Sequence, residues 1–179
     1  MPRLFTGIEI PQDIRLALSM KRGGLPGARW LEREDYHITL RFIGDVDHVM
    51  ARDIAGALEQ QSYLAPFTVR LTHLDVFGGD KPRSLFVRVE QNENLSRLFQ
   101  VQEKELQMTG LTPEGRKFLP HVTLARLRGV CAGEVARYLD QTNWFEPMEF
   151  LVTRFVLYSS KGSIGGGPYV VEDIFELEG

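Results

Sequence analysis

A four-residue frame of histidine, an apolar residue, threonine and leucine occurs twice in the chain, as HITL at residues 37–40 and as HVTL at residues 121–124. These frames hold two of only four histidines among 179 residues. Side chains two apart on a β-strand point to the same face, so each histidine shares a face with its threonine. The two apolar residues of each frame then point into the core. The pattern indicates two copies of one catalytic motif.

Two imidazoles that face each other suit displacement at phosphorus. One ring takes a proton from the attacking oxygen and the other protonates the leaving oxygen, and histidine can do either near neutral pH. The hydroxyls of Thr39 and Thr123 can donate hydrogen bonds to the non-bridging phosphate oxygens, where charge builds up. Neither frame has the histidine spacing of a metal site, and no carboxylate shares their strand faces. We therefore expect chemistry without a metal or another cofactor.

The elements that must position these frames repeat in one order: strand, helix, histidine strand, helix, strand. The order runs through residues 4–77 and again through residues 84–158, and a closing strand follows at 169–177. Periodicity, caps and turn residues predict the individual elements. We expect strands at 4–10, 36–44, 67–77, 84–90, 117–127, 149–158 and 169–177, and helices at 11–22, after Asp47, at 92–107 and at 133–141.

Short elements of mixed type predict an α+β fold with antiparallel sheets and helices packed outside them. A duplication gives two lobes related by a pseudo-two-fold axis, with equivalent residues facing each other across a central cleft. We expect a single bilobal domain over residues 1–179, with the active site in that cleft.

Composition limits the class of protein. A hydrophobic content of 43% and a charged content of 25% are ordinary for a globular domain. The single cysteine, Cys131, fits a reducing compartment. No apolar run approaches the roughly 18 residues of a membrane span. The opening MPRLFTGIEIPQD lacks the layout of a secretory signal. We expect a cytoplasmic monomer with no membrane partner.

The net charge of −3 argues against wrapping long nucleic acid, which usually needs a basic surplus. A nucleic acid partner would be held by an end, or over a few nucleotides, through a local cluster of arginines.

Two such frames, each within a strand and about half a chain apart, resemble those of the two-histidine (2H) phosphoesterases. The stretches HITLRFIGDV and PHVTLARL, the opening LFTGIEIP and the chain length closely resemble the RNA 2′,3′-cyclic phosphodiesterases, also called 2′-5′ RNA ligases. The resemblance covers nearly the whole chain, since FVLYSS also falls in family order. It implies a hydrolase that opens a 2′,3′-cyclic phosphate at an RNA 3′ end, possible substrates including tRNA fragments, and leaves a 2′-phosphate. Ligation is implied as a minor reverse activity.

The resemblance also implies a role for each site residue. His37 is the proton donor to the leaving 3′-oxygen, and His121 is the proton acceptor that activates water. Thr39 and Thr123 hold the phosphate, and Arg126 matches an arginine that contacts phosphate in some members.

Strand parity disagrees with the family pattern for the arginine. On a regular strand, Arg126 faces away from His121, and it reaches the cleft only if the strand bends or ends near Ala125. Arg41 has the right parity but less support from the resemblance. The sequence leaves this choice open.

Other readings remain open as well. The same two histidines suit a phosphodiesterase for a small cyclic nucleotide or ADP-ribose cyclic phosphate, or an RNA-joining or RNA-binding protein with weak hydrolysis. Trp30, Phe77 and Tyr158 are core residues by default, although an aromatic ring near the cleft could stack a base. His48 and His73 lack the frame and are expected at the surface.

Overall fold

Strands and helices alternate along the chain in the order that the sequence predicts. The computed structural model describes residues 3–61, 64–142, 145–160 and 167–179. Within these ranges the elements are β1 (Arg3–Glu9), α1 (Gln12–Ser19), β2 (Ala28–Trp30), the short 3-10 helix η1 (Arg33–Asp35), β3 (His37–Asp45), α2 (His48–Glu59), β4 (Phe67–Phe77), β5 (Ser84–Val89), α3 (Glu93–Met108), β6 (His121–Leu127), α4 (Ala132–Gln141), β7 (Met148–Val152), β8 (Arg154–Ser160) and β9 (Tyr169–Glu176). The predicted α+β class is confirmed.

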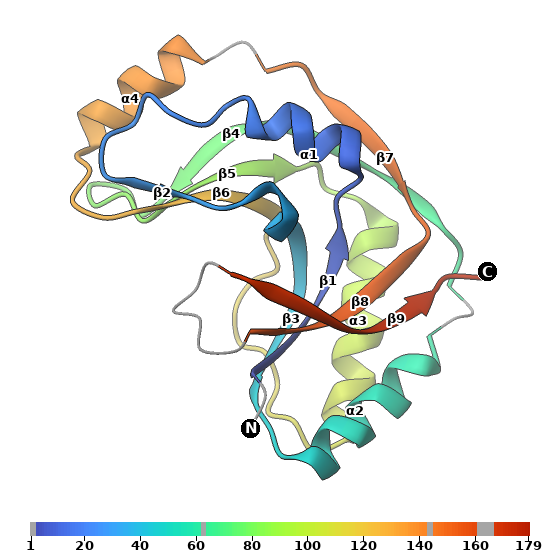
Figure 1. Ribbon diagram of the computed structural model, residues 1–179. Coiled ribbons are helices and arrows are strands. Elements are labelled where there is room, and N and C mark those ends of the chain that lie inside the picture. Colours follow the sequence, from blue (N-terminus) through green and yellow to red (C-terminus); the bar gives the residue numbers. More distant parts are fainter. Residues whose placement is uncertain (1–2, 62–63, 143–144, 161–166) are drawn as a thin grey trace.

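The strands form one antiparallel sheet, which the ribbon shows as a strongly curved surface (Figure 1). Its order is β7-β4-β5-β6-β3-β1-β8-β9, and β2 pairs separately with β6. The two histidine strands, β3 and β6, are neighbours at the centre, where Ile38 pairs with Val122. Each is flanked by the strand that opens its half of the chain, β1 beside β3 and β5 beside β6.

A strand exchange links the two halves of the chain. The last strand of the first half, β4, pairs with β5 of the second half, and β8 of the second half pairs with β1. The sequence order does not reveal this exchange. Each side of the sheet is therefore built from both halves, and the internal duplication remains an interpretation of the sequence pattern.

Two predicted strands differ from the structure by more than one residue at an end. The expected strand at 149–158 breaks at Thr153 into β7, which pairs with β4, and β8, which pairs with β1 and β9. The expected strand at 117–127 begins only at His121, directly after Pro120, which has no N–H to donate to a ladder. The centre of the predicted turn at 159–168, residues 161–166, lies outside the described residues.

Helices α2 and α3 show why the helical segments form where they do. Asp47 caps α2 as predicted, accepting a 2.8 Å hydrogen bond from the N–H of Met50. The side chain of Asn92 caps α3 in the same way. Ile54 and Leu58 of α2 are fully buried, and each such side chain contributes about 1.5–3 kcal/mol by leaving water. No helix in the described ranges is long and apolar enough to cross a bilayer.

Candidate active site

The four polar residues of the two frames line one cavity. His37, Thr39, His121 and Thr123 border a space of about 200 Å³. Between them, Ile38 and Val122 pair at the centre of the sheet, and both are fully buried on the opposite face. The alternation of a strand thus sends the polar half of each frame to the cavity and the apolar half to the core.

Both histidines are held by the same backbone contact. His37 Nδ1 lies 2.8 Å from the carbonyl oxygen of Asp35, and His121 Nδ1 lies 2.6 Å from that of Leu119. A carbonyl oxygen only accepts, so each Nδ1 donates and each Nε2 is left to exchange protons in the cavity. In the neutral state the Thr39 hydroxyl donates to His37 Nε2 across 2.9 Å.

Aromatic rings surround both imidazoles and reduce their contact with water. The ring of Tyr158 lies 5.4 Å from that of His37 between centroids, and the ring of Phe77 lies 5.0 Å from that of His121. Trp30 packs instead against Tyr138 of α4, at 6.1 Å between centroids. The other rings beside the two histidines are Phe5, Phe86 and Tyr169.

This burial shifts the titration of the rings. Burial lowers the pKa of His37 to about 4, against a raising contribution from the Asp35 carbonyl; His121, Arg126 and Arg15 add smaller lowering contributions. Burial likewise lowers the pKa of His121, with Arg126 again contributing. Both rings are therefore neutral at pH 7 in the protein without substrate. Burial also raises the pKa of the Tyr158 hydroxyl.

Arg126 lines the cavity, although regular strand parity would turn it away. The pairing of β5 with β6 explains this, because Phe86 lies opposite Thr123 and Leu85 lies opposite Ala125. Leu124 is skipped, which makes a β-bulge that reverses the parity of everything beyond it. This irregularity beside Ala125 meets the condition under which the sequence allows Arg126 to reach the cleft. The sequence contained a signal of this bulge. Its apolar residues fall at positions 122 and 124 and then at 125 and 127, so the alternation of the strand is interrupted once.

Arg41 does not reach the cavity. The matching bulge in β3 skips Leu40, which turns Arg41 into the core, where its side chain is 6% exposed. Its Nε lies 2.6 Å from Glu103 Oε2 of α3, and its terminal nitrogens donate to the carbonyl oxygens of Phe42 and Thr112 at 2.5 Å each. Of the two arginines that the sequence leaves open, Arg126 lines the cavity and Arg41 does not.

Phe42 is a cavity residue that the sequence reasoning missed. It holds the position in HITLRF that Arg126 holds in HVTLAR, and it lines the same cavity while being 43% exposed. Aligning the two frames beyond their leucines would have found it. Tyr169 and Arg3 line the cavity as well, and Arg126 is a hydrogen-bond partner of the Tyr169 hydroxyl.

The remaining candidates lie elsewhere. His48 and His73 are exposed, as expected, and Cys131 is exposed at the start of α4. Within the described ranges, no three His, Cys, Asp or Glu side chains gather in a way that could hold a metal ion.

A family model described as the 2′-5′ RNA ligase superfamily matches residues 12–163. The chain belongs to the 2′-5′ RNA ligase superfamily. The resemblance drawn from the two frames is confirmed. As in other members of this superfamily, the fold is α+β with a large antiparallel sheet.

Curated relatives in this superfamily carry a specific activity in their names. The chain is 34% identical to an RNA 2′,3′-cyclic phosphodiesterase of Bacillus subtilis, over 70% of this chain and 71% of that one. It is 31% identical to the protein of the same name from Thermotoga maritima, over 99% and 96% of the two chains. A crystal structure of a Thermus thermophilus protein superposes with a TM-score of 0.81 at 25% identity, covering 99% of this chain and 98% of that one.

Proposed function

We propose that this protein is an RNA 2′,3′-cyclic phosphodiesterase that opens the terminal cyclic phosphate and leaves a 2′-phosphomonoester. One observation carries the proposal. Two histidines on adjacent central strands each present Nε2 to one cavity, and each has a threonine on the same face. The names of the curated relatives indicate the same substrate.

Each histidine has one step in this reaction. His121 Nε2 takes a proton from water as the water oxygen forms a bond to phosphorus. The bond from phosphorus to the 3′-oxygen breaks, and His37 Nε2 gives its proton to that oxygen. The products are a 2′-phosphate and a free 3′-hydroxyl, and the two rings have exchanged protonation states. Which ring has which role rests on the family resemblance.

Three side chains hold the phosphate while its charge moves. Thr39 and Thr123 donate hydrogen bonds to the non-bridging oxygens, and the guanidinium of Arg126 offers charge-assisted donors at the same cavity wall. The Thr39 hydroxyl, which points at His37 Nε2 without substrate, turns to the phosphate when that ring becomes charged.

The proton donor must be charged before the leaving oxygen departs, yet burial keeps His37 neutral in the free protein. The substrate supplies the missing stabilisation. A phosphodiester carries a negative charge, and an opposite charge within about 4–6 Å favours the charged form of a titrating group. Substrate binding therefore raises the pKa of His37 and draws in the proton that it later donates.

Several finer expectations belong to this proposal. Attack by a 5′-hydroxyl in place of water is the same displacement, so 2′-5′ ligation is a minor reverse activity. We further propose that the protein is a cytoplasmic monomer, and that its substrates include tRNA fragments.

The test is a short RNA of defined sequence ending in a 2′,3′-cyclic phosphate, with identification of the product isomer. The proposal expects a 2′-phosphate, whereas a 3′-phosphate means that the substrate binds in the reverse orientation. Comparing kcat/KM with a cyclic mononucleotide and with ADP-ribose cyclic phosphate shows whether RNA is the preferred substrate.

A substrate analogue with an activated leaving oxygen separates the two histidine roles, because such an oxygen needs no proton. His37→Ala should then cost less activity with the analogue than with the natural ester, while His121→Ala should cost the same with both. The opposite pattern would show that His121 is the proton donor and His37 the proton acceptor.

A further inference from the structure

A second arginine lies directly beside the cavity arginine. In the pairing of β2 with β6, Arg29 is opposite Arg126. Directly opposite residues on antiparallel strands share a face and lie about 5 Å apart. Arg126 lines the cavity. Arg29 therefore lies on the cavity face, at its rim.

Like charges directly opposite each other destabilise a sheet. Arg29 is exposed, and within the described ranges its guanidinium has no ion pair or hydrogen bond. Arg126 makes a hydrogen bond with the Tyr169 hydroxyl. An anion between the two guanidinium groups would remove this repulsion.

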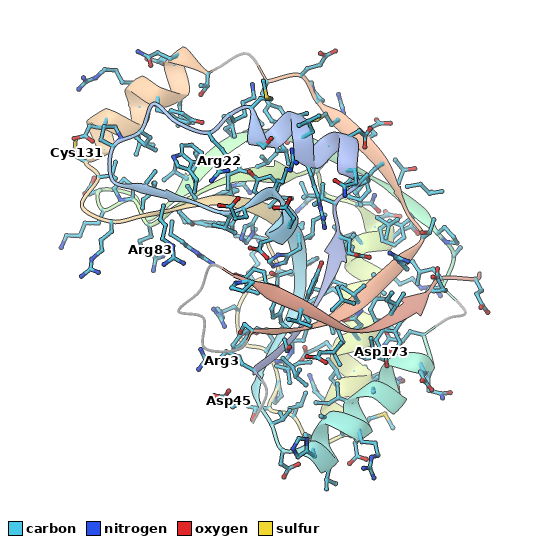
Figure 2. The ribbon with its side chains drawn as sticks, viewed as in Figure 1. Arg3, Arg22, Asp45, Arg83, Cys131 and Asp173 are labelled. Atoms are coloured by element: carbon cyan, nitrogen blue, oxygen red, sulfur yellow. The ribbon has the colours of Figure 1, made fainter. Side chains whose placement is uncertain are left out.

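The surroundings extend the positive charge in one direction. Arg128 is exposed two residues after Arg126, and the carbonyl oxygen of Arg83 accepts a 2.8 Å hydrogen bond from Leu127. Figure 2 shows Arg83 near the ends of β2, β5 and β6, away from Asp173. The net charge of the chain is −3, so an excess of positive charge at this end of the sheet is local.

Strand β9, which leaves the cavity on the side of Tyr169, is acidic. Strand β9 begins at Tyr169, which lines the cavity, and continues through the exposed residues Glu172, Asp173 and Glu176. A polyanion leaving the cavity along β9 meets repulsion, and one leaving along β2 meets attraction.

We propose that Arg29 forms, with Arg126, a second phosphate-binding site, which receives the phosphodiester on the 5′ side of the terminal nucleotide. This inference rests on the proposed function, because it assumes that the cyclic phosphate occupies the cavity. Arg29 then distinguishes an RNA end, which has this second phosphate, from a nucleoside cyclic phosphate, which does not. The RNA runs from the cavity over β2 and the adjoining end of β6.

The experiment compares two substrates: a nucleoside 2′,3′-cyclic phosphate with a free 5′-hydroxyl, and a dinucleotide ending in the same cyclic phosphate. Arg29→Gln should lower kcat/KM for the dinucleotide about 10-fold, the low end for a charge-assisted hydrogen bond, and leave the nucleoside unchanged. The matched control is Arg52→Gln, which removes an exposed arginine of α2 and should change neither value.

Salt supplies a second readout. Losing one phosphate contact to a single strand should reduce the slope of log(kcat/KM) against log salt concentration by about 0.7, for the dinucleotide only. Equal losses on both substrates, or no loss on either, overturn the inference.

If the wild-type protein turns over neither substrate, the proposed function fails separately. Calorimetric binding of the two 2′-phosphate products then tests Arg29 without turnover. Weaker binding of the dinucleotide alone supports the second site, and unchanged binding rejects it.

Discussion

Ile38 of β3 and Val122 of β6 lie directly opposite each other, and through this pair the two sides of the sheet meet. Because the strands are antiparallel, His37, one residue before Ile38, lies at the level of Thr123, one residue after Val122. By the same rule, Thr39 lies at the level of His121. Each histidine thus has one threonine on its own strand and the other across the pair. A register shift of one residue would turn one polar pair into the core.

Removing either cavity histidine should nearly abolish turnover. His37→Ala and His121→Ala are each expected to lower kcat by about 10²–10⁴-fold, the usual contribution of a positioned acid or base. The double variant should be far less impaired than the product of the two singles, because acid and base act as a unit. His48→Ala is the control, since that side chain is exposed on α2. A comparable loss in the control would show that the wrong pair was chosen.

The pH profile of kcat/KM should be bell-shaped with its maximum below the ordinary histidine pKa of about 6.5. Burial lowers the pKa of His37 to about 4 and lowers that of His121 as well, and kcat/KM reports the free protein. The two apparent values belong to the coupled pair. In the kcat profile, the alkaline limb should move to higher pH, because the bound phosphate stabilises an imidazolium. A kcat/KM maximum well above neutrality contradicts this expectation.

Stability should fall as the pH is lowered through the same window. The folded pKa of His37 is about 4, below the value of the unfolded chain, so between these values the unfolded chain binds a proton that the folded protein does not. The free energy of unfolding therefore decreases as pH falls from about 6.5 to about 4. Urea denaturation across this range should show a shallower decrease in His37→Gln than in wild type. His48→Gln should retain the wild-type slope.

Substitutions of the two candidate arginines should have different effects, one on stability and the other on activity. Arg41→Met leaves the partly buried Glu103 without its ion-pair partner, although Gln107 and the N–H of Glu114 still donate to it, and should cost about 3 kcal/mol of unfolding free energy, the low end for a buried pair. Adding Glu103→Leu should recover part of that loss, as a double-mutant cycle can measure. Arg126→Ala should change stability by about 0.5 kcal/mol or less, since its side chain is exposed, while lowering kcat/KM. Intact activity in Arg126→Ala would remove it from the phosphate site.

Activity should survive excess chelator. The proposed steps use protons on two imidazoles and hydrogen bonds from threonine and arginine, so removing divalent ions should leave kcat and KM unchanged. The measurement is turnover of the RNA cyclic phosphate after dialysis against EDTA. Loss of activity that a divalent ion restores would rule out the metal-free mechanism.

Much of the fold and site could be predicted because the signals are local. Strand alternation fixed which side chains of HITL and HVTL share a face, and Asp47 marked the start of α2. The repeated order of elements predicted the α+β class. Each signal involves residues within one turn or one strand, where backbone geometry determines which side chains share a face and where a helix begins.

Only the tertiary structure decided what depends on pairing between distant segments. The break at Thr153 follows from two different partner strands, β4 and β1, which periodicity cannot distinguish. The orientation of Arg126 depends on a bulge against β5, and its pairing with Arg29 depends on where β2 joins the sheet. Register and bulges are set by contacts between strands far apart in the chain, so spacing within either strand does not determine them.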